Sequence, residues 1–295
     1  MAYRNAWRMR PWPDLAFLGV LQEMFEFLQN DPHDYLVMCF DDRPPKFRLR
    51  LWPEYKSHRG KQRKSSPETE KIYGIYRHSV SVLPGLLERL GIDAARARGY
   101  EGDDVIGALA LRRFSGSGIT IISEDLDFIQ LCDGDRVRVY HPSKREYGGA
   151  CPDGWLYRKM LVGDASDNLP GLPGVGPVKA GKLLDSLPPF QGFDELVEHA
   201  RDRGEKGDPT AGALYREREN LRRQMRVIDL RRTARIANRR LAIARGLFDG
   251  EAAMRYPPLV RGMAEHTDVK PLAILPFKRL FSRMRPVIGH LEEEA

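Results

Sequence analysis

The sequence predicts an α/β protein: a mostly parallel sheet flanked by helices, with a helical C-terminal part. Two observations carry this prediction. Apolar runs at 35–40, 119–123 and 136–140 have the length and composition of buried strands, and helical patterns lie between them. Such alternation is typical of parallel sheets. From about residue 155 the strand signal fades, and proline, glycine and helical spacing take over.

The helices of the first part follow from capping residues and apolar spacing. A helix is expected at 13–30, where Pro-Asp can cap its start. A second is expected at 67–91, with proline at the first helical position and glycine at its end. A third is expected at 105–114, and a short helical turn at 126–131.

The fading strand signal places a boundary near residue 150. The segment beyond it contains one expected helix with an apolar face made by Leu214, Leu221, Met225 and Ile228. We therefore expect an α/β domain at 1–150 and a helical domain at 151–295.

The charge of the chain indicates a polyanionic partner. Its 295 residues can bury a sizeable core, and the formal net charge is +7, with arginine in excess. A basic surface attracts a polyanion such as nucleic acid. The alternative is a basic surface that only aids solubility, although the positive charge here is strongly clumped.

The cysteines and the apolar runs bound the cellular setting. Cys39, Cys132 and Cys151 are odd in number, and no pair has the spacing of a zinc site. We expect a reduced, intracellular protein. No apolar run approaches the roughly 20 residues that span a bilayer, and the N-terminus lacks the apolar core of a signal peptide.

Eight acidic residues in four short clusters are the most informative feature of the chain. They are Asp41; Glu101, Asp103 and Asp104; Asp125 and Asp127; and Asp164 and Asp167. Acids beside core-forming segments are costly to desolvate unless a cation pairs with them. Ligands of open α/β sheets gather at the carboxyl ends of strands, where two of these clusters fall. The pattern predicts divalent cations bound by oxygen ligands, and magnesium suits such a site.

Each cluster also has a plainer interpretation. Asp103 and Asp104 could cap a helix and favour its positive end. Asp125 and Asp127 could be turn acids, and the last cluster lies in a loop whose composition suits a turn. The coincidence of all four clusters is what favours metal binding.

A strongly basic segment lies between the first and second clusters. Its nine cations face a single acid, Glu54, and they are Arg43, Lys46, Arg48, Arg50, Lys56, Arg59, Lys61, Arg63 and Lys64. Phe47, Trp52 and Tyr55 are interleaved with them. Cations that track phosphates and aromatics that stack on bases are typical of single-strand binding. The alternative is a solvated charged loop with its aromatics in the core.

Residues 171–184 (GLPGVGPVKAGKLL) have the pattern of a helix-hairpin-helix. Gly174 and Gly176 permit close backbone approach, and the following helix start can point N–H groups at a phosphate. Lys179 and Lys182 add charge. Such a hairpin contacts the duplex backbone without reading sequence. By itself a Pro/Gly hairpin is also common in proteins that bind nothing.

Taken in order, these motifs resemble the 5′-nuclease family. The matching segments are 100–107 (YEGDDVIG), 123–131 (SEDLDFIQL) and 163–177 (GDASDNLPGLPGVGP). The segment 40–59 resembles the family's second acidic block and the arch beyond it, and the likeness covers most of 15–245. The family comprises phage and bacterial 5′→3′ exonucleases, flap endonucleases and the 5′-nuclease domain of DNA polymerase I. No polymerase region is seen, so a stand-alone nuclease is the closest likeness.

The resemblance implies a PIN-like catalytic core that holds two magnesium or manganese ions. The first metal site corresponds to Asp41, Glu101, Asp103 and Asp104. The second corresponds to Asp125, Asp127, Asp164 and Asp167. Lys56 and Arg59 match basic residues that contact the scissile phosphate and neutralise charge developing on it. Tyr100 is expected to pack in the core, with base stacking as the alternative.

The resemblance also implies how DNA is held. The basic arch (43–80) would clamp a single-stranded 5′ end or flap, and the hairpin (about 164–185) would grip the duplex, with K⁺ as an option there. The DNA-binding residues would be Arg43, Lys46, Arg48, Lys56, Arg59, Lys61, Gly174, Gly176, Lys179 and Lys182. A monomer in the cytoplasm of a bacterium or a phage-infected host is expected.

The chain departs from the family at its start. The usual first block, a strand that ends in Asp-Gly-Asn or similar, does not precede residues 1–7, so the first strand and one metal-binding Asp would be missing. Either Met1 is an internal methionine or the protein is shortened and impaired. The expected function is therefore a metal-dependent 5′→3′ exonuclease or flap endonuclease that hydrolyses DNA by a two-metal mechanism. The alternative is a catalytically impaired binder of DNA junctions.

Overall fold

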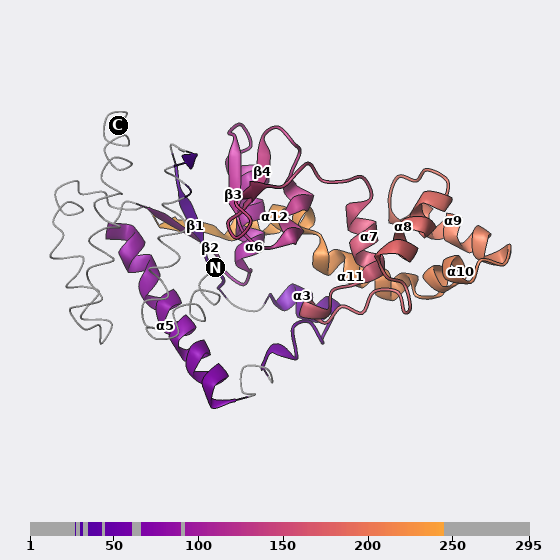
Figure 1. The fold of residues 1–295 in the computed structure, drawn as a ribbon, viewed down its shortest axis with the longest axis horizontal. Helices are drawn as coiled ribbons and strands as arrows, with labels where there is room; N and C mark the ends of the chain where they lie inside the picture. Colours follow the sequence, from indigo (N-terminus) through magenta and orange to yellow (C-terminus); the bar gives the residue numbers. More distant parts are fainter. Residues whose placement is uncertain are drawn as a thin grey trace.

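The computed structural model describes residues 27, 30–31, 35–42, 45–60, 66–89 and 92–244. These residues form two small sheets with their covering helices and a mainly helical region. Figure 1 shows the sheets toward one end of the molecule and the helices α8, α9 and α10 at the other end. The helix expected at 13–30 lies outside the described residues apart from Phe27 and Asn30.

The first sheet has the strand order β1-β2-β6. β1 (Val37–Cys39) runs parallel to β2 (Asp93–Ala97), and β2 runs antiparallel to β6 (Leu241–Ala244). Ala95 and Ala97 are completely buried, so the small side chains of β2 let covering elements approach closely. β2 was not expected from the sequence, because its residues (DAARA) lack the β-branched side chains that mark strands.

The second sheet has the order β3-β4-β5. β3 (Ile119–Ile122) is parallel to β4 (Val137–His141), which is antiparallel to β5 (Glu146–Tyr147). The strands expected at 119–123 and 136–140 are confirmed. The prediction of a mostly parallel sheet is corrected, because each sheet pairs one parallel with one antiparallel neighbour. The antiparallel partners are a local hairpin strand and a strand from the C-terminal side.

Four helical elements surround these sheets: α3 (Lys46–Leu51), α5 (Pro67–Arg89), α6 (Gly102–Ala108), which continues as the wider turn η2 (Leu109–Arg113), and η3 (Leu126–Leu131). The helical turn expected at 126–131 is confirmed. The helix expected at 105–114 begins earlier, at residue 102, because the backbone N–H of Glu101 donates to Asp104 at 3.1 Å and caps the first turn.

The helical region contains α7 (Trp155–Val162), η4 (Ala165–Asp167), α8 (Pro177–Ser186), α9 (Phe193–Glu205), α10 (Pro209–Arg216) and α11 (Arg218–Ile228). These helices share one apolar core, in which Leu161, Leu196, Leu214 and Leu221 are fully buried or nearly so. The single helix expected through Leu214 and Ile228 is wrong. The chain breaks it at Glu217, between α10 and α11.

The end of the described chain returns to the sheets. α12 (Leu230–Ala237) packs along α6, and η5 (Asn238–Arg240) leads into β6. The close approach requires glycine in α6, because a Cβ at Gly107 would lie 3.3 Å from the Cβ of Ala234. Elements from beyond residue 150 thus pack against elements from before it, and the domain boundary near residue 150 stays a prediction. Among the helices described, none combines the length and the apolar content needed to cross a membrane.

Candidate active site

The first acid group forms where β1 ends against the start of α6. Asp41 Oδ1 accepts a hydrogen bond of 2.6 Å from the backbone N–H of Gly102, and a Cβ at Gly102 would lie 3.3 Å from that oxygen. Glycine therefore lets the Asp41 carboxylate approach the helix start. Glu101 occupies the cap position of α6, and Asp103 lies in its first turn. The positive end of the helix favours carboxylates there.

Asp103 connects this group to the second acid cluster of the sequence. Burial, together with the nearby carboxylates of Asp125, Glu101 and Asp41, raises the pKa of its carboxyl to about 7 against the opposing charge of Lys56. Within the described residues, Asp103 has no hydrogen bond or ion pair. The site therefore holds a carboxylate that its protein surroundings do not neutralise.

Asp104 has a different partner, which speaks against its prediction as a metal ligand. The side chain is completely buried, and its two oxygens accept hydrogen bonds of 2.7 and 2.6 Å from the guanidinium of Arg48. Arg48 is itself 2% exposed and also donates to Glu101 and to the backbone of Val227. The burial of Arg48 speaks against its prediction as a DNA-binding residue. The pair of Arg48 and Asp104 instead fastens α3 to α6 and α11.

The second acid group is assembled around one lysine. Asp125 begins η3 and accepts a hydrogen bond of 2.8 Å from the backbone N–H of Asp127. Asp164 begins η4 and accepts one of 2.8 Å from the N–H of Ser166. Lys159, on α7, places its Nζ 2.8 Å from an oxygen of Asp127 and 2.8 Å from an oxygen of Asp164. One ammonium thus joins acids that are 37 positions apart in the chain.

Opposing effects set the charge of this group. Burial raises the pKa of Asp127, although Lys159 opposes it. Burial would also raise the pKa of Asp164, but hydrogen bonds from Lys159 and Ser166 outweigh burial and lower it. Burial alone would lower the pKa of Lys159, and its two carboxylate partners raise it instead. The lysine therefore stays charged.

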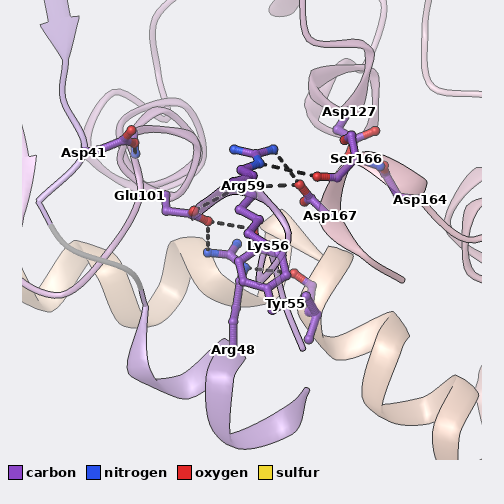
Figure 2. Close-up of polar contacts among 12 residues, drawn as sticks. Asp41, Arg48, Tyr55, Lys56, Arg59, Glu101, Asp127, Asp164, Ser166 and Asp167 are labelled. Atoms are coloured by element: carbon purple, nitrogen blue, oxygen red, sulfur yellow. Dashed lines mark hydrogen bonds and ion pairs between the residues drawn. The ribbon is translucent and has the colours of Figure 1, made fainter. Parts of the chain in front are cut away.

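Two more cations lie between the acid groups. Lys56 Nζ is 2.8 Å from Glu101 and 3.8 Å from Asp167, while Arg59 is 2.8 Å from Asp167. Figure 2 shows Lys56 and Arg59 reaching in between Glu101 on one side and Asp167 on the other. Burial and the carboxylates of Asp164 and Glu101 raise the pKa of Asp167 against both cations. These two cations therefore connect the first acid group, through Glu101, to the acids of the η4 loop, through Asp167.

The backbone that carries Lys56 is locked to the loop that carries Asp167. Lys56 has a φ of 54°, a left-handed conformation that is strained for lysine, and its N–H donates to the Asp167 carbonyl at 3.0 Å. Asn168 donates to the carbonyl of Glu54 at 2.9 Å, and its own carbonyl accepts from the Trp52 indole at 2.9 Å. These contacts hold a strained residue where its ammonium faces both acid groups.

Two glycines close the loop that follows α7. Gly163 and Gly171 have φ values of 79° and 66°. A Cβ at Gly163 would lie 2.4 Å from the carbonyl oxygen of Leu169, and one at Gly171 would lie 2.5 Å from the Gly163 nitrogen. No larger residue fits either position, so this tight closure of the loop requires glycine at both. Gln224, which is almost fully buried, accepts the Gly171 N–H at 2.8 Å.

The aromatic residues of the basic segment follow the alternative interpretation. Tyr55 is 6% exposed, and its hydroxyl donates to Glu101 at 2.9 Å. Burial and the carboxylates of Glu101 and Asp167 raise the pKa of Tyr55 well above its usual range. Phe47 packs against Tyr100 with ring centroids 5.6 Å apart. These side chains build the core and support the acids, which leaves little of them for base stacking.

The remaining predicted DNA-binding residues occupy two places. Lys46 is exposed on α3. Gly174 has a left-handed φ of 74°, Gly176 caps α8, and Lys179 and Lys182 are exposed on that helix. Arg43 and Lys61 lie outside the described residues.

Lys159 is the site residue that sequence reasoning missed. The available signal was a lysine that directly follows Arg158 and precedes the apolar end of α7, just before the GDASD loop. A charge at the end of an apolar helix face, beside a cluster of acids, indicates pairing rather than solvation.

The donors at this site fit a divalent cation in kind. They are carboxylate oxygens, the ligands that magnesium and manganese prefer, and Asp103 is left without a cationic contact beside three other acids. No three His, Cys, Asp or Glu side chains in the described part of the chain already lie close enough to hold an ion. Instead Lys56, Arg59 and Lys159 pair with the acids. The carboxylates could bind a divalent ion after Lys56, Arg59 and Lys159 have released them.

Comparisons with known proteins agree with this geometry. A sequence model described as the 5′-3′ exonuclease N-terminal, resolvase-like domain matches residues 10–153. A 5′-3′ exonuclease of Streptomyces coelicolor is 33% identical over 207 residues, covering 65% of this chain and 68% of that protein. One of Mycobacterium tuberculosis is 32% identical, with 65% and 66% covered. The thermostable DNA polymerase I of Thermus aquaticus is 32% identical, but only 20% of its length is matched.

The fold has a counterpart among solved structures. A flap endonuclease of bacteriophage T5, in a complex with DNA and metal ions, superposes with a TM-score of 0.64 at 17% identity, covering 85% of this chain and 89% of that one. The likeness shows a shared fold. The chain belongs to the 5′-3′ exonuclease family.

Proposed function

We propose that this protein is a divalent-metal-dependent 5′→3′ exonuclease and flap endonuclease that hydrolyses phosphodiesters of DNA. The observation that carries the proposal is that Lys56 and Arg59 lie between two groups of carboxylates and pair with Glu101 of the first group and Asp167 of the second. The T5 counterpart, which was solved with DNA and metal ions, supports the substrate and the cofactor class.

The acids divide into two proposed ligand sets. Asp41, Glu101 and Asp103 would hold one ion, and the second set is Asp125, Asp127, Asp164 and Asp167. Asp104 is left out because Arg48 occupies it. A pair of bound divalent ions would supply an activated water and neutralise the leaving oxygen. In the reaction, water adds to phosphorus and one P–O bond breaks, which leaves a phosphate at one new end and a hydroxyl at the other.

Lys56 and Arg59 are proposed to hold the reacting phosphate. Both now pair with carboxylates and both keep part of their side chains exposed, at 19% and 39%. A phosphate entering between the acid groups would therefore meet two cations already aimed at it, and preorganised donors of this kind stabilise developing negative charge. Tyr55 would act as a positioning residue through its hydrogen bond to Glu101.

The turn before α8 is the proposed grip on the duplex. Gly174 and Gly176 expose backbone at the turn, and Lys179 donates to the Gly174 carbonyl at 3.0 Å, which holds an exposed charge at the same place. Such a turn contacts phosphates without reading bases. The helix-hairpin-helix role, and K⁺ binding at it, stay predictions.

A cleavage assay tests the proposal. The purified chain is incubated with 5′-labelled flap DNA in Mg²⁺ or Mn²⁺, with and without chelator, beside the Asp103→Asn variant. We expect short labelled products only when metal is present, and none from the variant. Cleavage that survives chelation would contradict the proposal. Flap binding without hydrolysis in either metal would identify the impaired junction binder instead.

A further inference from the structure

A basic pocket lies at the junction of α11 and α12, apart from the acid cluster. It has a volume of about 270 Å³ and is lined by Asp229, Arg231, Arg232 and Arg235. The three arginines are exposed, and within the described residues none of them has an ion pair with an acid. The single carboxylate is engaged, since Asp229 accepts the backbone N–H of Arg232 at 3.0 Å. The pocket therefore carries excess positive charge.

The wall of the pocket is fixed from behind by a buried glutamine. Gln130, 3% exposed, accepts the backbone N–H of Leu230 at 2.9 Å and donates to the carbonyl of Ile228 at 3.3 Å. Its own carbonyl accepts from Nε of Arg231 at 2.6 Å. The start of α12 is thus held in place before any ligand arrives, which lowers the entropy cost of binding.

The positive charge continues along the outer face of α12. Arg232 and Arg235 are three residues apart, so they share one side of α12, and the exposed Arg239 follows in η5. The opposite side of α12, with Leu230 and Ala234, is buried against α6. Several cations in succession suit a repeating polyanion better than one small anion.

We propose that this pocket binds backbone phosphates of nucleic acid, as a contact separate from the acid cluster. This inference rests on the proposed function, because it takes the same DNA to be the ligand. The placement gives the contact a purpose: Gln130 belongs to η3, the turn whose start carries Asp125 and Asp127. A phosphate held by Arg231 and Arg232 is thereby set at a fixed position relative to the acids.

The test removes two of the pocket charges and measures DNA binding without cleavage. The double variant Arg232→Gln/Arg235→Gln and the wild type are titrated against fluorescent flap DNA in chelator over a series of salt concentrations. We expect the Kd to rise about tenfold and the slope of log Kd against log salt to fall by about two.

The matched control is Arg112→Gln/Arg113→Gln, which removes two exposed charges at the end of η2. An equal loss of binding in this control, or no loss in the pocket variant, would overturn the proposal. A free phosphate ion could bind the same pocket, and calorimetry with inorganic phosphate tests this. If the wild type binds phosphate tightly, and the pocket variant loses that binding while its DNA binding is unchanged, the pocket belongs to a free anion and the assignment to DNA is overturned. The binding arm needs no hydrolysis, so a wild type that fails to cleave would count against the proposed function alone.

Discussion

The two ends of the segment 46–59 use their cations in opposite ways. Arg48 is buried and bound on all sides: to both oxygens of Asp104, to Glu101 and to a backbone carbonyl. Lys56 and Arg59 also pair with acids, but they remain partly exposed. From the sequence alone, all three cations were predicted to contact DNA.

We infer that burial, and not charge, separates the structural cation Arg48 from the proposed phosphate-binding cations Lys56 and Arg59. A guanidinium without solvent access cannot exchange its carboxylate for a phosphate, because neither partner can be rehydrated during the exchange. A half-exposed ammonium can. The structural pair is therefore expected to govern stability, and the exposed pair to govern activity.

The substitution with the largest expected effect on stability is Arg48→Ala. It leaves the buried Asp104 carboxylate without its partner, and breaking a buried pair in this way costs about 3–5 kcal/mol of unfolding free energy. Chemical denaturation measures the loss. The control Arg50→Ala removes an exposed cation of the same helix and should change stability by less than about 0.5 kcal/mol. Equal effects of the two substitutions would refute a structural role for Arg48.

Lys56 offers the reverse case. Lys56→Gly keeps the left-handed backbone at lower strain and removes the ammonium, so we expect unfolding free energy to be kept or raised by up to about 1 kcal/mol. Cleavage should fall by about 10²–10³-fold, as for removal of one stabilising donor. Steady-state kinetics on flap DNA measures the second effect. A variant that unfolds easily yet cleaves normally would reverse the assignment.

Asp103 provides the corresponding test for an acidic residue, in which stability and activity are expected to change in opposite directions. Asn at this position keeps the shape and removes a charge that no cation neutralises, so Asp103→Asn should raise the Tm in chelator while abolishing cleavage. Mg²⁺ should then stabilise the wild type, by about 2.7 kcal/mol at 100 times its Kd, and the variant less. Thermal unfolding with and without Mg²⁺ measures both. A lower Tm of the variant in chelator would show that the carboxylate is already satisfied.

Much of the site was predictable because its acids sit at strand and helix ends that have strong local signals. Apolar runs placed β1 and β3, and Asp41 follows the first strand as Asp125 and Asp127 follow the second. What could not be predicted were the long-range partners. No residue near Asp104 in the sequence indicates that Arg48, 56 positions away, is its partner. In the same way, β6 is recognised as a strand only by its pairing with β2. Which distant side chains and strands pair depends on which surfaces become buried, and the local sequence pattern does not indicate which surfaces these are.

The smallest expected effect comes from the contact that fixes Lys56 in place. Asn168→Ala removes the amide that donates to the Glu54 carbonyl and to the Ser57 hydroxyl, and it puts alanine at a φ of 60°. We expect a loss of about 1–2 kcal/mol in unfolding free energy, together with a modest fall in kcat because Lys56 is less firmly aimed. Asn168→Gly, which relieves the backbone strain and still lacks the amide, separates the two causes. If Gly restores kcat fully, the hydrogen bonds have no positioning role, and the left-handed turn at Asn168 alone holds the basic segment against the acids.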